Sequence, residues 1–116
     1  KAKDRLPSQA SGGEAQRAAI ARAVINHPGL LFADEPTGAL NRKNSEEVMD
    51  LLTFLNQEGQ SILMVTHDVK AAIRGNRILY LEDGKILDEI SLTPFDAQTA
   101  KEREEKLSAW LSFLSW

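Results

Sequence analysis

The stretch Leu30-Leu31-Phe32-Ala33-Asp34-Glu35-Pro36-Thr37 decides the fold that we expect for this chain. Residues 30–33 form a continuous apolar run, which is typical of a strand buried on both faces of a parallel sheet. Asp34 and Glu35 then place two adjacent carboxylates where the strand ends, and open α/β folds bind ligands at that edge. One carboxylate could hold Mg²⁺, mostly through water, and the other could orient or deprotonate an attacking water molecule. The alternative is a solvated acidic turn.

Apolar patterns with helical and strand spacing alternate along the chain, which predicts an α/β fold with a parallel sheet. We expect a helix from Ser11 to the Pro28-Gly29 stop, a helix from about Asn44 to Gln57, and a buried strand over Ser61–Val65. Further along we expect a short helix to about Arg74, a hairpin of residues 77–81 and 85–90 around Glu82-Asp83-Gly84, and an amphipathic helix over residues 97–114.

Bulk composition excludes several classes of protein. The chain has 116 residues and a net charge of −3 without a basic block, so we expect one small domain and no nucleic-acid partner. It has no cysteine, which excludes disulfides and thiolate metal sites, and no apolar run long enough to cross a bilayer. Because it begins at Lys1 without Met or an apolar signal region, we interpret it as a cut inside a longer protein.

Ser11-Gly12-Gly13-Glu14 opens the first expected helix. Glycines at a helix start leave backbone N–H groups open to a phosphate, and the helix dipole adds positive potential there. Glycine also lets another chain approach closely. The alternative is an ordinary capped helix, in which Ser11 and Glu14 form a capping box. That box leaves the two glycines, which are poor helix formers, unexplained.

Two further polar residues are expected near the same sheet edge. His67 follows the second buried strand, so it would share an edge with Asp34 and Glu35 and could hydrogen-bond a terminal phosphate oxygen. A turn or capping role is the alternative for this histidine. Asn41 lies on the loop after Gly38-Ala39-Leu40 and is more simply explained as the N-cap of the following helix.

In combination these motifs resemble the C-terminal half of the ATP-binding subunit of an ABC transporter. Ala10-Ser11-Gly12-Gly13-Glu14 is similar to the family's signature motif, L-S-G-G-Q, and Leu30 to Asp34 resembles its Walker B strand. Glu35 falls where the family has its catalytic carboxylate. Gly38-Ala39-Leu40-Asn41 corresponds to the D-loop and His67 to the switch histidine.

The resemblance implies a partial parallel-sheet P-loop NTPase core with a signature helix, a C-terminal β-hairpin and a C-terminal helix. Residues 1–29 would be the signature helix at the end of a helical subdomain, and residues 30–92 the C-terminal half of the ATPase core. Residues 93–116 would form the C-terminal amphipathic helix.

The resemblance also implies a composite site, since two such subunits of the family face each other head to tail and bind ATP between them. In trans, Ser11, Gly12, Gly13 and Glu14 would bind the γ-phosphate of the partner's ATP, with Asn41 in the D-loop. In cis, Asp34 would hold Mg²⁺ through water, and Glu35 and His67 would be catalytic. A transmembrane permease is the other implied partner, and it would place the subunit peripherally on the cytoplasmic face of the plasma membrane.

The motif Ala33-Asp34-Glu35-Pro36-Thr37-Gly38 is similar to that of the subfamily that serves macrolide export, lipoprotein release and antimicrobial-peptide efflux. The tail from Asp96 to Trp116 most resembles the bacitracin-type peptide-efflux members. There are three departures from the family pattern. Ala10 replaces Leu, Glu14 replaces Gln, and Asn41 replaces an Asp that the family uses to couple its two subunits.

No stretch of the chain fits G-x-x-x-x-G-K-[ST], the loop that grips a nucleotide. We therefore expect the chain alone to be inactive and to self-associate through an exposed sheet edge, which recruits other chains. Two rival interpretations are an ABC ATPase of DNA repair or translation, and a non-catalytic interaction module that keeps the fold. The repair proteins insert long coiled coils that are not visible here, and the translation factors typically carry Asn-His-Leu-Asp after Pro-Thr.

Overall fold

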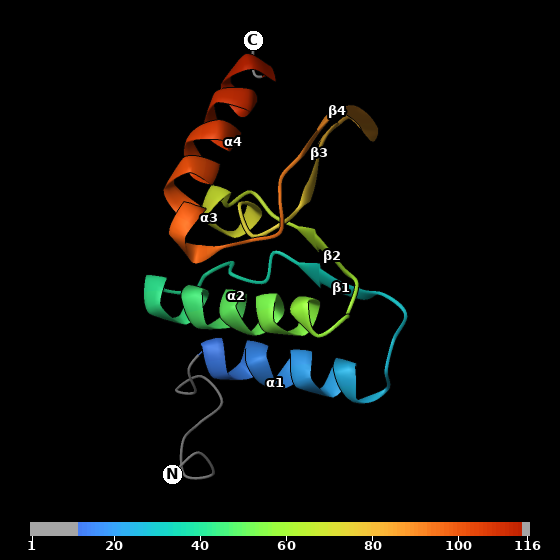
Figure 1. The fold of residues 1–116 in the computed structure, drawn as a ribbon. Helices are drawn as coiled ribbons and strands as arrows, with labels where there is room; N and C mark the ends of the chain where they lie inside the picture. Colours follow the sequence, from blue (N-terminus) through green and yellow to red (C-terminus); the bar gives the residue numbers. More distant parts are fainter. Residues whose placement is uncertain (1–11, 115–116) are drawn as a thin grey trace. The chain divides into compact units, whose positions relative to one another are not determined.

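The computed structural model describes residues 12–114, which form two compact units divided between Thr66 and His67. Each unit has its own two-stranded sheet (Figure 1), parallel in the first unit and antiparallel in the second. The expected mixed α/β class is confirmed. Residues 1–11 lie outside the described residues, and with them Ala10 and Ser11 of the signature-like motif.

The first unit alternates helix and strand: α1 (Gly12–Ile25), β1 (Leu31–Asp34), α2 (Arg42–Gln57) and β2 (Ile62–Val65). The two strands run parallel, with Leu31 opposite Ile62 and Asp34 opposite Val65. Parallel neighbours need a crossover connection, and α2 provides it. The observed elements therefore match the expected order, with bounds that differ by a few residues at most.

The core of the first unit lies on one face of the strands. In the view of Figure 1, α2 lies between α1 and the two strands, so both helices are on the same side of the sheet. The buried apolar side chains of this unit are Ile20, Leu31, Ala33, Val48, Met49 and Leu52. Phe32, Leu63 and Val65 are exposed at 58%, 46% and 44%. Within the first unit the helices therefore cover one face of the strands, and the expectation of strands buried on both faces is not met by this unit taken by itself.

The helix ends of this unit follow from local chemistry. Asn41 is the N-cap of α2, and its extended backbone turns the chain into the helix. After Gln57 the chain reverses at Gly59, whose φ of +106° suits glycine and ends the helix as the sequence predicts. His27 follows α1 with φ +50°, and its N–H donates to the carbonyl of Val24 at 2.9 Å.

The second unit contains α3 (Val69–Ala72), β3 (Arg77–Glu82), β4 (Lys85–Ser91), a 3-10 turn (Ala97–Thr99) and α4 (Ala100–Leu114). The strands form the expected hairpin, and its turn residues Asp83 and Gly84 have φ of +51° and +75°. Two successive positive φ values are typical of the tight turns that match strand twist. Arg77 spans the hairpin, with Nε 2.8 Å from Oε2 of Glu89, and this contact lowers the pKa of Glu89.

α4 packs within the second unit through its apolar side. Leu107 is fully buried, and the indole Nε1 of Trp110 donates to Oδ2 of Asp88 at 3.0 Å. The Trp110 ring meets Tyr80 edge-on, with 6.3 Å between centroids. The expected amphipathic helix is therefore confirmed. Within residues 12–114, none of the helices combines the length and the apolar character needed to cross a membrane.

Candidate functional site

Asp34 and Glu35 lie at the carboxyl end of β1, as the sequence predicts. Asp34 is the last residue of the strand and is exposed. Glu35 has φ +48°, a left-handed conformation that costs a non-glycine residue about 1–3 kcal/mol. Its N–H donates to the carbonyl of Val65 at 2.6 Å, and its carbonyl accepts from the N–H of Gly38 at 3.0 Å. The backbone of the second acid is thus held on both sides in a strained conformation.

A buried turn holds Glu35 in this conformation. Pro36 and Thr37 are buried directly after Glu35. The N–H of Leu40 donates to the carbonyl of Thr37 at 3.2 Å, and Ala39 also has a positive φ, of +65°. At Gly38 a Cβ would lie 3.3 Å from the carbonyl oxygen of Glu35, a contact tight enough that the turn would have to shift slightly to admit it. The segment that carries the acids is therefore a turn ordered by burial and hydrogen bonds, in contrast to a freely solvated acidic loop.

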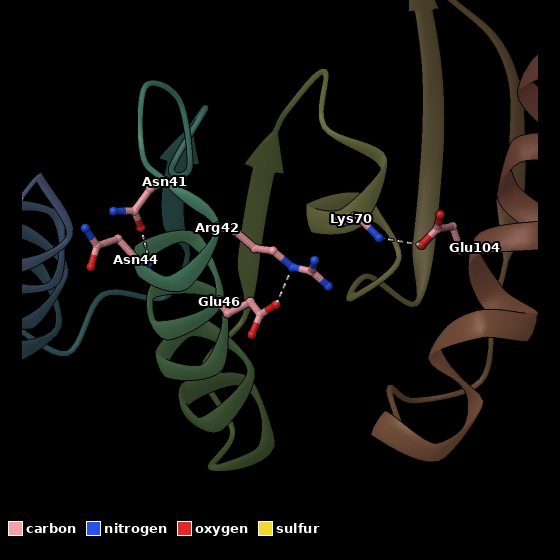
Figure 2. A network of polar contacts seen from close by, with 6 residues as sticks. All are labelled: Asn41, Arg42, Asn44, Glu46, Lys70 and Glu104. Atoms are coloured by element: carbon pink, nitrogen blue, oxygen red, sulfur yellow. Dashed lines mark hydrogen bonds and ion pairs between the residues drawn. The ribbon is translucent and has the colours of Figure 1, made fainter.

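Asn41 closes the turn and begins α2. Its Oδ1 accepts a hydrogen bond from the N–H of Asn44 at 2.8 Å (Figure 2), and its carbonyl accepts from the N–H of Ser45 at 2.8 Å. The N-cap interpretation of Asn41 is confirmed. Its role in a D-loop stays a prediction. Figure 2 also shows the exposed pair that follows, in which Nε of Arg42 lies 3.3 Å from Oε1 of Glu46.

Gly12 and Gly13 begin α1 where this helix meets the turn and α2 of its own chain. A Cβ at Gly12 would lie 2.7 Å from Cδ2 of Leu40. A Cβ at Gly13 would lie 2.9 Å from Cβ of Asn44 and 3.1 Å from Nη1 of Arg17. The close approach that glycine permits is therefore used within the chain at Gly13, because the Cβ of Asn44 is fixed to the backbone of α2. At Gly12 the near atom is the end of the flexible Leu40 side chain, which can rotate away.

Charged residues continue the contact between α1 and α2. Nη1 of Arg17 lies 3.1 Å from Oε2 of Glu47, which is an ion-pair contact without hydrogen-bond geometry. Glu14 is exposed on the first turn of α1. Its predicted capping partner, Ser11, lies outside the described residues, so the capping box and any phosphate contact of this motif stay predictions.

His67 is the first residue of the second unit. The next residue, Asp68, caps α3, since its Oδ1 accepts from the N–H of Lys70 at 2.9 Å. β2 ends at Val65, so His67 does follow the second parallel strand, as expected. The shared edge of His67 with Asp34 and Glu35 would join the two units and stays a prediction.

The carboxylates suit Mg²⁺ only as part of a larger coordination shell. Asp34 and Glu35 offer the oxygen donors that this ion prefers. Among residues 12–114, no group of three or more His, Cys, Asp or Glu side chains could hold a metal ion. Because Mg²⁺ keeps several waters and often binds phosphate oxygens, one exposed carboxylate such as Asp34 fits it, and a protein cage is not required.

Three contributors to this region have no signal in the sequence. Leu40 and Asn44 crowd the glycines of α1, and Val65 holds the N–H of Glu35. Leu40, Asn44 and Val65 lie 28, 31 and 30 residues along the chain from Gly12, Gly13 and Glu35, respectively, so periodicity and turn chemistry do not reveal them. Alternation of helical and strand patterns predicts only that β2 lies beside β1.

Comparison with known proteins supports one family. The model of the family described as "ABC transporter" matches residues 1–38. The chain is 52% identical over 91 residues to the ABC transporter ATP-binding protein MJ0796 of Methanocaldococcus jannaschii, covering 78% of this chain and 39% of that protein. It is 51% identical over 86 residues to the macrolide export ATP-binding/permease protein MacB of Chlorobaculum tepidum, covering 74% of this chain and 13% of that protein.

Solved structures agree with the sequence comparison. A dimeric post-hydrolysis state of the MJ0796 cassette, bound to ADP and Pi, matches 79% of this chain and 40% of that chain, with a TM-score of 0.66 and 46% identity. A nucleotide-free ATP-binding cassette matches 76% of this chain and 35% of that chain, with a TM-score of 0.68. At 20% identity this second match shows the fold alone. The chain, which spans about two fifths of its MJ0796 relative, therefore belongs to the ABC transporter family of ATP-binding cassettes.

Proposed function

We propose that this chain supplies the acid-bearing half of an ATP-hydrolysing cassette that drives export across a membrane. The observation that carries the proposal is the strained, doubly hydrogen-bonded backbone of Glu35 directly after Asp34. Strained backbone is retained mainly where function requires it. The relatives named for macrolide export support a role in efflux.

In the proposed hydrolysis, Glu35 orients a water molecule and accepts its proton as the water oxygen attacks the γ-phosphorus. The bond to the β–γ bridging oxygen breaks, and the products are ADP and phosphate. Asp34 would bind Mg²⁺ through water, and the ion would neutralise charge on the phosphates. His67 would donate a hydrogen bond to the γ-phosphate, so that it also senses the loss of this group.

The helix start at Gly12 and Gly13 would serve a second subunit. The dimeric MJ0796 structures support a pair of cassettes. In the head-to-tail pair that we propose, Ser11, Gly12, Gly13 and Glu14 would face the γ-phosphate of the partner's ATP. Asn41 would contribute to the D-loop, where it offers an amide in place of the carboxylate with which the family couples its two subunits. The glycines would then have two roles, since they also admit Leu40 and Asn44 of their own chain.

A permease would be the remaining partner, and it would hold the cassette on the cytoplasmic face of the plasma membrane. The MacB relatives carry an ATP-binding part and a permease part in one protein, by their names. We propose an amphiphile such as an antimicrobial peptide as the exported substrate, on the resemblance of the tail from Asp96 to Trp116.

The test compares Glu35→Gln with Glu58→Gln in the full-length protein that carries this chain. Glu58 is the exposed C-cap residue of α2 and serves as a matched control for loss of one carboxylate. We expect Glu35→Gln to lower ATP turnover by roughly 10²-fold or more while ATP binding persists, since general-base catalysis contributes about that factor. Turnover within twofold of the unsubstituted protein would show that Glu35 is not the base.

The 116-residue chain by itself should neither hydrolyse ATP nor remain monomeric. It lacks the phosphate-gripping loop, and Leu63 and Val65 stay exposed beside the open edges of a two-stranded sheet. Mg²⁺-dependent turnover above the Glu35→Gln background would refute the first expectation. A monomer by light scattering at high concentration would refute the second.

A further inference from the structure

Arg103 of α4 is a buried cation that the proposed hydrolysis does not use. The residue is only 4% exposed, and its guanidinium donates to three backbone carbonyls at 2.7 Å: Nε to Ile73, Nη1 to Thr93 and Nη2 to Gly75. Burial lowers the pKa of Arg103. A buried charge is costly unless its donors find acceptors, so these three carbonyls are what make the position of Arg103 tolerable.

The three acceptors belong to segments that a single side chain holds together. Ile73 is the C-cap residue of α3, and Gly75 follows it before β3, so Arg103 satisfies carbonyls at the end of that helix. Thr93 precedes α4 in the chain. The planar fork of an arginine suits several acceptors at once, which the compact ammonium of a lysine does not. Phe95 adds a ring contact, with its centroid 5.3 Å from Cζ of Arg103.

α3 is too short to hold its own position. It has four residues, Val69–Ala72, and a helix of that length is unstable alone. α4 supports it at a second point, since Nζ of Lys70 lies 3.1 Å from Oε1 of Glu104 (Figure 2). The N-cap of α3 is Asp68, the residue directly after His67. Contacts that fix the position of α3 therefore also fix the backbone position of His67.

We propose that Arg103 is a positioning residue that acts from α4, through α3, on the switch histidine His67. The proposal rests on the proposed function, because it takes His67 as the group that meets the γ-phosphate. It predicts that loosening α4 from α3 lowers the rate of hydrolysis while leaving the affinity for ATP unchanged, since the residues placed at the metal and at the water lie in the other unit.

The first measurement is hydrogen exchange on the 116-residue chain with Arg103→Lys and Arg103→Met. The reporter amides are those of Ala72, Ile73 and Gly75, whose N–H groups donate to Asp68, Val69 and Ala72. We expect about tenfold faster exchange or more at these amides, and no change in α2. Arg77→Lys is the matched control, because Arg77 makes an exposed pair on the hairpin. Unchanged exchange at the reporter amides would show that Arg103 does not hold α3 in place.

The second measurement is ATP turnover by the full-length protein. We expect Arg103→Lys to lower kcat about tenfold with KM for ATP unchanged, and Arg77→Lys to leave both unchanged. In a His67→Ala background, Arg103→Lys should lower kcat no further, because residues that act through one group are not additive. A purely structural role would instead give the same loss in both backgrounds.

The outcomes separate this inference from the function on which it rests. No ATP turnover in the unsubstituted full-length protein would overturn the proposed function, whatever the exchange rates show. Normal turnover together with fast exchange at α3 and an unchanged kcat in Arg103→Lys would overturn only the positioning role. Loss of kcat that is additive with His67→Ala would likewise overturn it.

Discussion

Replacing Gly13 by alanine tests whether packing within the chain explains the glycines at the start of α1. The new Cβ would lie 2.9 Å from Cβ of Asn44, 3.0 Å from its Cγ and 3.1 Å from Nη1 of Arg17, where ordinary contacts are 3.4–4 Å. The Arg17 side chain can swing away. The Cβ of Asn44 is fixed to the backbone of α2, so α1 and α2 must separate by several tenths of an ångström.

The expected change in the free energy of unfolding follows from two opposed contributions. Overpacking of a close contact costs about 1–3 kcal/mol. Alanine gains at most about 1 kcal/mol over glycine in a helix, and less at a helix end. Gly13→Ala should therefore lower the free energy of unfolding by about 1–2 kcal/mol, which changes the ratio of folded to unfolded protein by a factor of roughly 5–30.

Urea unfolding of the 116-residue chain at one fixed, low protein concentration, followed by far-ultraviolet circular dichroism, measures this difference. Gly29→Ala is the matched control, because a Cβ at Gly29 meets nothing within 4 Å. The control should stay within about 0.5 kcal/mol of the unsubstituted chain, as surface substitutions do. If Gly13→Ala is as stable as Gly29→Ala at an equal m-value, close packing is not the reason for glycine at this position.

Two further predictions concern the helix cap and the hairpin. Asn41→Ala should destabilise the chain by about 1 kcal/mol in urea, whereas Asn41→Asp keeps an acceptor for the N–H of Asn44 and should not; equal loss in both variants would refute the cap. Arg77 lowers the pKa of Glu89 in the folded chain. The stabilisation of the folded chain by this pair is therefore complete above pH 4.5, the ordinary pKa of a glutamate, and it is lost as the pH falls through the lower pKa of the folded state. Hydrogen exchange of β3 and β4 should therefore accelerate in acid, and a Glu89→Gln variant that shows the same acid dependence would rule out this pair as the cause.

Several elements followed directly from the sequence because their causes are local. The Asp83-Gly84 turn, the Gly59 helix stop and the Asn41 cap each depend on the chemistry of one or two residues. The alternation of strand and helix around Asp34 and Glu35 likewise predicted a parallel pair that ends at the two acids. Family membership could also be inferred from the sequence, because short motifs recur in a set order and spacing.

Other features depend on atoms that are distant in sequence. Periodicity indicated that β1 is buried, but only the packing shows that the helices of the first unit cover one face of the strand and leave Phe32 exposed. Nothing in the sequence pattern distinguishes Arg103 from the other charged residues of its helix, whereas three carbonyls outside α4 surround its guanidinium.

By itself, the sequence determined the order of the elements, the acids at the strand end and the family, since each of these depends on residue type and spacing. Tertiary structure alone decided which side chains crowd Gly12 and Gly13, why Glu35 is held in a left-handed conformation, and that a buried arginine supports the helix after His67. The physical reason is that close contacts, backbone strain and desolvation depend on distances between segments, and neither composition nor periodicity contains those distances.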